Sequence, residues 1–410
     1  MLFSIERDSL LNHLNIIQKG LPLKTPMPIL YAIKFEALQD HMILTTSNSD
    51  VAIQVIVDDP SLEIKTPGKT AIPGRYLIDI VRKVVSKTIE FALIEQNIMV
   101  IRADKSEFKL RLMDVEDYPD IDFMDLNDPL TFDPKLLSNV IKETNFATSQ
   151  NEKRPVLTGV DFKFLEKKLF CVATDSYRLA QKEMAFDLER DPFDLVIPNK
   201  SLDELQKILE TINSPVELYI NPNKVLFKFD NILFQTRLLE GSYPDTMRII
   251  PKSFVVEIPF HKEQLLAAID RVSLLSPKER ETNVNIVKLA LKENQVVEIS
   301  STNAEIGDAS EEIIPSGDVK GPQIKLAFSS KYLKEALKTF HSEEVTISFS
   351  GEIKPFIITG KDDPSLLMMR MELKDAEIWT ADLSIKGMFK LFTGKQIDPD
   401  EMGDHARVNV

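Results

Sequence analysis

The chain has 410 residues, of which 43% are apolar and 8% aromatic, enough for two or three domains of about 100–200 residues each. Its 50 basic and 64 acidic residues give a formal charge of −14, which excludes a polycation that coats nucleic acid through bulk charge. A single cysteine, Cys171, excludes an intramolecular disulfide framework and any cysteine-rich zinc or iron–sulfur site.

Neither a secretory leader nor a membrane helix is expected. The N-terminal segment MLFSIERDSLLNHL carries acidic residues within its first ten positions and lacks the apolar core that a signal peptide needs. No stretch reaches the ~18 uninterrupted apolar residues of a membrane helix. We therefore expect a soluble cytoplasmic protein with no membrane partner.

The sequence repeats one pattern three times. An extended apolar start is followed by apolar residues at helical spacing in segments 5–17, 132–141 and 260–269. The starts of these segments are separated by 127 and 128 residues, at Ile5, Phe132 and Phe260. A fixed period is the sequence signature of tandem structural units, so the chain is expected to hold three copies of one domain.

Further along each copy, an apolar strand and a second helix are predicted. The strands contain residues spaced by 127 and 127, namely Phe35, Phe162 and Leu289. The second helices are predicted over 75–87, 200–207 and 331–338, with Leu77, Leu202 and Leu333 in register.

Each copy closes with an alternating strand that carries one arginine, at Arg111, Arg237 and Arg370. The first two copies continue into Tyr118-Pro119-Asp120 and Tyr243-Pro244-Asp245. These ordered features predict an α+β fold of three tandem domains, each with two helices on antiparallel sheets and about eight short strands. We expect domains over 1–126, 127–253 and 254–372, and an atypical extension, 373–410, with a short amphipathic helix around Leu383 to Leu391.

The segment that joins the first two copies is strongly acidic. Residues 114–128 carry seven acidic residues and no basic one. These carboxylates are compatible with a divalent-metal site for phosphoryl chemistry, which would make the chain a nuclease or polymerase. A solvated linker is the favoured interpretation, because metal ligands usually converge from separate elements.

A catalytic motif is not found elsewhere. The five histidines form no HxH or HExxH pair, and the sequence has no Walker loop, no GxGxxG after a strand and no nucleophile elbow. With only 13 glycines, a phosphate-cradling loop is poorly supported. We therefore expect no catalytic residue, no metal and no cofactor, and a function that resides in the shape of the molecule.

Three segments, taken with the triplicated unit, carry a family resemblance. They are ATDSYRLA at 173–180, LLEGSYPD at 238–245 and LMMRM at 367–371. Together they resemble the bacterial sliding clamp, the beta subunit of DNA polymerase III, over about residues 1–372. The resemblance implies a head-to-tail homodimer that closes into a six-domain ring around duplex DNA, with helices lining the hole, and that tethers the replicative polymerase.

A ring holds DNA by topology and needs only weak, non-sequence-specific phosphate contacts, which reconciles DNA binding with a charge of −14. The predicted helix 75–87 carries four basic residues and one acidic residue, and the predicted helix 331–338 carries three basic residues and one acidic residue. The predicted helix 200–207 carries two of each. The resemblance places DNA contacts at Lys24, Arg75, Asn151, Pro155 and Val156. Because the last two stand where some members carry tyrosines, neighbouring Arg154 is expected to supply a phosphate contact.

The resemblance also implies a hydrophobic pocket for short peptides of the polymerase's alpha-type subunit, the clamp loader and other clamp-motif proteins. The matching residues are Leu157, Thr174, Ser176, Tyr177, Arg178, Leu179, Pro244, Arg248, Ile249, Ser329, Tyr332, Ile353, Pro355, Leu366, Leu367, Met368, Met369 and Arg370. The dimer contact matches Phe108, Leu110, Leu274 and Leu275.

Two alternatives remain open at this stage. A ring-shaped interaction scaffold, or a diverged clamp paralogue with altered DNA or partner binding, fits the absent tyrosines and the extension. The extension follows the expected pocket directly, so residues 373–410 are predicted to cover or extend its edge. In the clamp interpretation, the protein works in the bacterial cytoplasm, associated with the nucleoid at replication forks.

Overall fold

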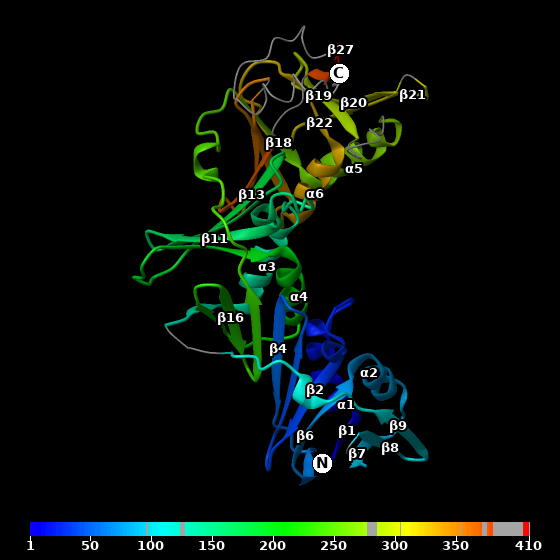
Figure 1. Cartoon of the computed structure of the whole chain (residues 1–410). Helices are drawn as coiled ribbons and strands as arrows, with labels where there is room; N and C mark the ends of the chain where they lie inside the picture. The colour runs from blue at the N-terminus through cyan, green and yellow to red at the C-terminus, as the bar shows by residue number, and fades with distance from the viewer. Residues whose placement is uncertain are drawn as a thin grey trace, which may run out of the picture. The chain divides into compact units, whose positions relative to one another are not determined.

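The computed structural model describes residues 1–95, 97–123, 128–276, 285–303, 305–352 and 354–370, together with two strands in the extension. The chain divides into two compact units (Figure 1). Unit 1 comprises Met1–Cys171 and Asp187–Tyr243, and unit 2 comprises Val172–Phe186 and Pro244–Val410. The second sequence copy, 127–253, therefore contributes two segments, 172–186 and 244–253, to unit 2.

The predicted threefold repeat is confirmed, since strands and helices follow one order in each copy. The first copy contains β1 (Leu2–Glu6), α1 (Arg7–Ile17), β2 (Ala32–Ala37), β3 (Met42–Ser47), β4 (Val51–Val57), β5 (Glu63–Thr66), β6 (Gly68–Pro73), α2 (Gly74–Lys83), β7 (Thr88–Ile94), β8 (Ile98–Ala103) and β9 (Ser106–Arg111).

The second and third copies lack a counterpart of the short β5 among the described residues. The second contains β10 (Leu130–Phe132), α3 (Pro134–Asn145), β11 (Gly159–Leu165), β12 (Lys168–Thr174), β13 (Arg178–Ala185), β14 (Phe193–Pro198), α4 (Asn199–Leu209), β15 (Val216–Ile220), β16 (Lys224–Phe229) and β17 (Ile232–Arg237). The third contains β18 (Val256–His261), α5 (Lys262–Val272), β19 (Ile286–Leu291), β20 (Val297–Asn303), β21 (Gly307–Ile313), β22 (Lys325–Ser329), α6 (Ser330–Thr339), β23 (Glu344–Phe349), β24 (Phe356–Gly360) and β25 (Leu366–Arg370).

Antiparallel pairing joins a strand of one copy to the last strand of the next. In unit 1, β4 pairs with β17 from Val51↔Thr236 to Val55↔Ile232, within a sheet of order β10-β15-β16-β17-β4-β3-β2-β6. In unit 2, β13 pairs with β25 from Arg178↔Arg370 to Lys182↔Leu366, and the order continues β25-β24-β23-β18. The same kind of junction therefore occurs twice.

Two other sheets each have an end strand, β9 or β21, that pairs on one side only. The sheet β5-β1-β7-β8-β9 ends at β9, and the sheet β21-β20-β19-β22 ends at β21. Among the described residues, β9 pairs only with β8 and β21 only with β20. These two edges expose backbone donors and acceptors that a further strand can use.

The helices pack in pairs on the sheets, α1 with α2, α3 with α4 and α5 with α6 (Figure 1). Alternation places Phe3 and Ile5 of β1 inside. The ring of Phe3 stacks on Phe91 with centroids 4.6 Å apart. In the third copy the ring centroids of Phe349 and Phe356 are 5.4 Å apart. Aromatic side chains thus fill corresponding cores.

One predicted helix is shorter than its sequence pattern suggests. Instead of spanning 75–87, α2 ends at Lys83, because Val84 has an extended backbone with ψ 146°. The Val84 N–H still donates to the carbonyl of Ile80 at 3.0 Å. Valine has a low helix propensity, and two valines in succession favour leaving the helix here. Lys87 consequently lies outside the helix, which keeps three of the four predicted basic residues.

The acidic segment between the first two copies, called the connector here, is described over residues 114–123 and at 128. It is anchored to unit 1 rather than wholly solvated. Tyr118 is 7% exposed and its hydroxyl donates to the carbonyl of Thr45 at 3.3 Å; burial raises the pKa of this phenol. Val115 and Ile121 pack against a buried cluster that includes Leu30. The described carboxylates of this segment are exposed, as the solvated-linker interpretation expects, whereas its apolar residues pack against neighbours far away in the sequence.

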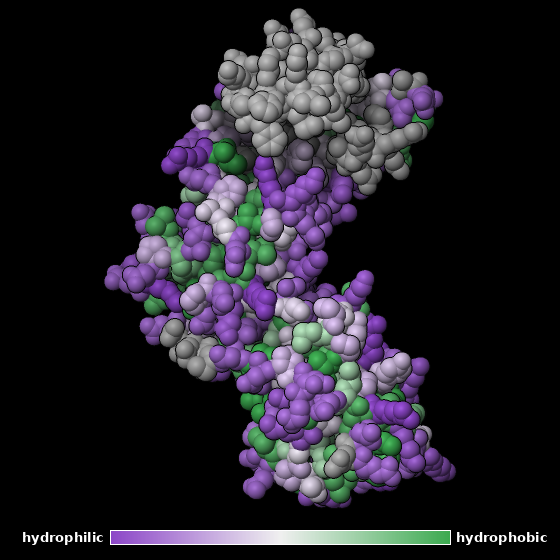
Figure 2. All heavy atoms as spheres, viewed as in Figure 1, coloured by the Kyte–Doolittle hydropathy of each residue, from purple (hydrophilic) through white to green (hydrophobic). Residues whose placement is uncertain are grey.

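The extension contains two described strands, β26 (Asp375–Trp379) and β27 (His405–Asn409), which pair antiparallel. The helix predicted around Leu383 to Leu391 lies outside the described residues. No helix in the described part of the chain is long and apolar enough to cross a membrane. On the face drawn in Figure 2, hydrophilic residues predominate and hydrophobic residues form small groups between them.

Asp161 is an unusual carboxyl in the second copy. It lies in β11, is 4% exposed, and its Oδ1 atom has no hydrogen-bond partner. Burial, followed by the hydrogen bond and the negative charge of Asp194, raises its pKa to about 8. An unfolded aspartate titrates near ~3.9, so between these values the folded protein holds a proton that the unfolded chain has lost. Stability should therefore fall as the pH rises through this window.

The variant Asp161→Asn should not lose stability in this way as the pH rises. We expect the free energy of unfolding of the variant to match that of the parent near pH 4–5 and to exceed it by roughly 1–3 kcal/mol near pH 9, because an amide carries no charge to desolvate. Unfolding followed by circular dichroism across this pH range tests the prediction. The exposed Asp191→Asn serves as control, and identical pH profiles for parent and Asp161→Asn would contradict it.

Candidate functional site

A tight turn between β12 and β13 presents Arg178. The backbone N–H groups of Tyr177 and Arg178 both donate to Asp175 Oδ1, at 2.9 and 3.0 Å. Thr174 Oγ1 donates to the Arg178 carbonyl at 2.6 Å, and Ser176 has a φ of +77°. Short polar side chains that bind nearby backbone groups favour such a turn. The ATDSYR segment therefore builds its own scaffold.

The Arg178 side chain is held by charges and by a ring. Its Nε atom donates to Asp175 Oδ2 at 3.1 Å, and Nη1 donates to Glu335 of α6. Its guanidinium carbon lies 4.5 Å from the centroid of the Tyr332 ring, within the range of a cation–π contact. With 12% of its side chain exposed, Arg178 is paired with two carboxylates, as a largely buried charge requires.

Helix α6 and strand β25 complete this part of unit 2. The side chain of Ser329 caps α6 by accepting from the Tyr332 N–H, which fixes the helical turn that carries Tyr332 and Glu335. Strand β25 pairs with β13, so that Leu179 is opposite Met369. Below the turn, Lys182 donates to Asp363. Segments from two sequence copies thus meet around Arg178.

The residues predicted for a peptide pocket divide by exposure. Tyr177 is 59% exposed and Ile249 51% exposed, and Arg248 is exposed with an ion pair to Asp245 at 2.8 Å. Ser176 and Pro244 are also exposed. Four are partly buried: Arg178, Tyr332, Pro355 and Leu367. The buried members are Thr174, Leu179, Ser329, Leu366 and Met368.

Four predicted pocket residues belong to unit 1 or are described only in part. Leu157 is buried within unit 1, in a short 3-10 turn at 155–158. Ile353 lies outside the described residues. For Met369 and Arg370 the structure describes the backbone of β25. The structure therefore brings together the turn, the start of α6 and β25 for this site.

Sequence reasoning missed two members of the Arg178 cluster, Asp175 and Glu335. Asp175 precedes Arg178 by three residues, the spacing of an Asx turn, and this signal was available in the sequence. Glu335 follows Tyr332 by three residues on one helix face. Its contact with Arg178, however, joins residues 157 positions apart, and no local pattern encodes it.

The predicted DNA contacts form two groups within unit 1. Lys24 and Arg75 are exposed, and Arg75 lines a hollow of about 270 Å³ with Leu23 and Arg82. The second group lies in the loop after α3, where Asn151, Arg154 and Pro155 are exposed and Val156 is partly buried. Asn151 Oδ1 accepts from the Lys153 N–H at 3.0 Å. Exposed cations and amide donors of this kind can bind phosphates.

The predicted dimer residues lie at the two open sheet edges. Phe108 and Leu110 are partly buried residues of β9 itself. Leu274, which is 79% exposed, and Leu275 belong to a 3-10 turn, 273–275, that contacts β21. Each open edge therefore has apolar side chains beside it.

Within the described residues, no cluster of three or more histidine, cysteine or acidic side chains is placed to hold a metal ion. The described carboxylates of the connector, such as Asp117 and Asp120, are exposed.

Models of three domains of one protein match consecutive parts of this chain. The N-terminal, central and C-terminal domain models of the DNA polymerase III beta subunit match residues 1–122, 131–245 and 247–374. The chain belongs to the DNA polymerase III beta-subunit family. The function of this family is that of the DNA sliding clamp, a processivity factor of DNA polymerase III.

Curated relatives and solved clamps agree with this membership. The beta sliding clamp of Staphylococcus epidermidis is 38% identical over 379 residues, covering 91% of this chain and 99% of the relative, and that of Staphylococcus aureus is 37% identical over the same shares. The crystal structure of the Bacillus subtilis DNA polymerase sliding clamp has a TM-score of 0.86 and 36% identity, with 91% of this chain and 99% of that chain covered. The crystal structure of the DNA polymerase III beta chain of Streptococcus pneumoniae has a TM-score of 0.86 and 35% identity, again with 91% of this chain and 99% of that chain covered.

In this clamp, the turn before Arg178 should depend on Asp175. Replacing it in Asp175→Ala removes the acceptor of two backbone N–H groups and one partner of Arg178. We expect hydrogen–deuterium exchange in peptides covering 175–180 to accelerate about tenfold or more, since a lost charged hydrogen bond weakens local structure by roughly 1.5–3 kcal/mol. Asp187→Ala, at an exposed position, serves as the control. Exchange over 175–180 that is as slow in Asp175→Ala as in the parent would refute this role.

Proposed function

We propose that this sliding clamp closes as a head-to-tail homodimer, in which the β21 edge of one protomer pairs with the β9 edge of the other. The observation that carries the proposal is the repeated junction. β4 pairs with β17 and β13 pairs with β25, and β21 and β9 are the corresponding strands of the third and first copies. A third junction of the same kind is intermolecular, and two copies of the chain make six domains in a closed ring.

The apolar side chains at these edges support the same pairing. In the proposed ring, Leu274 and Leu275 beside β21 meet Phe108 and Leu110 of the partner's edge. Covering Leu274, which is 79% exposed, removes a large apolar surface from water. Pairing also satisfies the backbone groups of two strand edges that are otherwise open to aggregation.

Duplex DNA passes through the proposed ring without sequence readout. Lys24, Arg75, Asn151 and Arg154 are the candidate phosphate contacts, and Pro155 and Val156 line the same path. Few weak contacts suit a protein that must slide, because each phosphate contact adds salt-dependent affinity and slows movement. The chain itself has no active site in this proposal and acts as part of the polymerase holoenzyme, in the cytoplasm at replication forks.

Partners bind, in this proposal, around Arg178. The exposed Tyr177, Arg248 and Ile249 form an accessible rim for a short peptide from the polymerase, the clamp loader or another clamp-motif protein, and Leu179, Leu366 and Met368 lie beneath. Apolar anchors with arginines at the rim are typical of a peptide hot spot. We place the domain boundaries near 126 and 253, and the extension, 373–410, at the edge of this site.

The dimer edge can be tested with Leu274→Asp. A carboxylate placed in an apolar contact must be desolvated without a partner, so we expect the dimer to dissociate and loading onto nicked circular DNA to be lost. Light scattering measures the mass, and retention on circular DNA with release after linearisation measures encirclement. Leu188→Asp, at a leucine that is 39% exposed, should stay dimeric. A dimeric, loadable Leu274→Asp would contradict the proposed interface.

The partner site can be tested with a labelled Gln-Leu-Ser-Leu-Phe peptide. We expect saturable fluorescence anisotropy with the full chain and at least a tenfold loss of affinity in Arg178→Ala, since Asp175, Glu335 and Tyr332 then lose their common partner. A truncation after residue 372 reports whether the extension limits access. Wild-type affinity in Arg178→Ala would move the site away from this cluster and leave the ring proposal intact.

A further inference from the structure

The junction between the first and second copies contains counterparts of the parts that surround Arg178. The turn 47–51 joins β3 to β4 as the turn 174–178 joins β12 to β13. Residues 118–122 follow the closing strand of the first copy as 243–247 follow that of the second. Arg237 at the end of β17 corresponds to Arg370 at the end of β25. The repeat therefore produces a second place where turn, connector and arginine-bearing strand meet.

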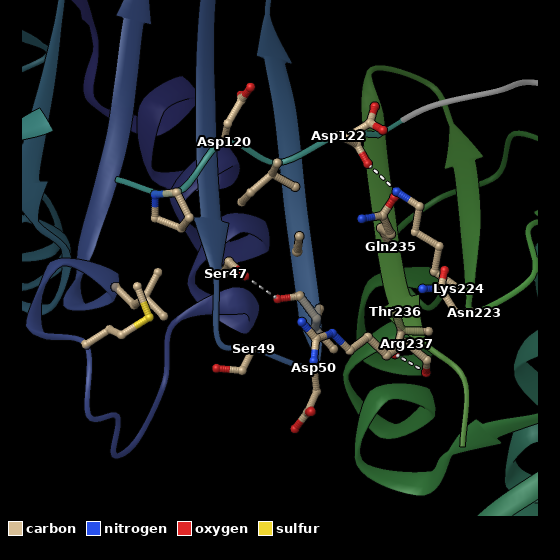
Figure 3. A pocket seen from close by; sticks show the side chains of 16 residues that line it. Ser47, Ser49, Asp50, Asp120, Asp122, Asn223, Lys224, Gln235, Thr236 and Arg237 are labelled. Atoms are coloured by element: carbon tan, nitrogen blue, oxygen red, sulfur yellow. Dashed lines mark hydrogen bonds between the residues drawn. The ribbon is translucent and has the colours of Figure 1, made fainter. Parts of the chain in front are cut away.

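In unit 1 these three parts enclose a cleft of about 400 Å³, a volume typical of ligand sites. Figure 3 shows Ser47, Ser49 and Asp50 on the first-copy side and Gln235 and Arg237 on the second-copy side, with the connector above them. The Lys224 Nζ atom donates to the main-chain oxygen of Asp122 at 2.6 Å, which ties the connector to β16. The cleft is thus built from elements that other contacts hold in place.

One part of the cleft wall is apolar and rigidly packed. Leu30, Ala52 and Pro119 line it together with Ile121. Leu30 is 2% exposed, and Ile121 packs against the buried cluster that contains it. Because this wall belongs to a core, it offers a preformed surface for an apolar side chain.

The polar lining combines three carboxylates with two cationic donors, Lys224 and Arg237, of which Lys224 already donates to the main-chain oxygen of Asp122. Asp50, Asp120 and Asp122 line the cleft and are exposed, so they favour a cation at the rim. Gln235 Oε1 is buried and has no hydrogen-bond partner, a state that disfavours the folded protein. Rotation of this amide toward the cleft lets a ligand donor satisfy it. The Arg237 guanidinium, an obligate donor, suits a carbonyl oxygen.

We propose that this cleft binds an extended peptide segment that carries a hydrophobic side chain beside a basic one. The apolar wall takes the hydrophobic side chain, and the three carboxylates take the basic one. The peptide backbone supplies an N–H for Gln235 and a carbonyl for Arg237, a combination that a simple amine lacks. With three carboxylates and two cations, the lining of this cleft is net acidic.

The inference goes beyond the proposed function, because it concerns a different junction and a different peptide. Its failure leaves binding at Arg178 untouched, and binding of Gln-Leu-Ser-Leu-Phe serves as an internal measure of that site in every variant. If neither peptide binds to a variant, the chain is misfolded, and circular dichroism identifies this separately.

The test uses the full chain and a labelled Gly-Lys-Leu-Lys-Leu-Gly peptide, with Gly-Glu-Leu-Glu-Leu-Gly as the charge-reversed probe. We expect saturable anisotropy with the basic peptide and at least tenfold weaker binding of the acidic one. Asp120→Asn/Asp122→Asn should weaken the basic peptide at least fivefold, and Gln235→Leu should weaken it about threefold or more. The matched control Asp187→Asn/Asp191→Asn removes the same two charges from exposed positions in another loop and should leave affinity unchanged.

Three outcomes would overturn the proposal. Equal weakening in the two double variants would mean that the peptide responds only to net charge. Full affinity in Gln235→Leu together with Asp120→Asn/Asp122→Asn would place the peptide elsewhere. Binding of n-butylamine as tightly as the peptide would replace a peptide site with a site for a simple cation.

Discussion

The structure depends above all on antiparallel pairing between strand edges of successive copies. A four-strand set with an open edge is a liability in water, because its backbone groups seek any other strand. Here β4 is covered by β17 and β13 by β25, so each copy satisfies an edge of its neighbour. The arrangement leaves one edge of each type open, at β21 and β9, and the proposed dimer follows from the same constraint.

Around the second junction, ion pairs of charged side chains add to the backbone pairing of β13 with β25. Arg178 stands at the first residue of β13, and its two carboxylate partners come from the preceding turn and from α6. A buried cation needs such partners, and they in turn restrict the guanidinium to one geometry over Tyr332. At the first junction, three carboxylates and two cations line a cleft. One repeated scaffold thus carries a different set of charged side chains at each junction.

Much of the fold could be predicted from the sequence, because periodicity and turn chemistry are local. The strand around Phe35 and the helix around Leu77 follow from spacing alone, and so does the order of elements in each copy. The end of α2 at Lys83 depended on two valines that continued the apolar pattern but favoured an extended backbone. Contacts across long separations could not be predicted: Tyr118 reaches Thr45, 73 residues away, and Arg178 reaches Glu335. The short motif at 173–180 therefore pointed to Arg178, and the structure supplied its charge partners.

The assignment of segment 172–186 to unit 2 also bears on how the chain is made. β13 belongs to the second sequence copy, yet its partner β25 begins at Leu366, and the Lys182–Asp363 contact spans 181 positions. During synthesis, β13 leaves the ribosome long before β25 exists. Until then its edge has no partner, and closing so long a loop is slow. The second junction therefore cannot form before residues 366–370 have been synthesised, so the strand pairing beside Arg178 exists only on chains that are nearly complete.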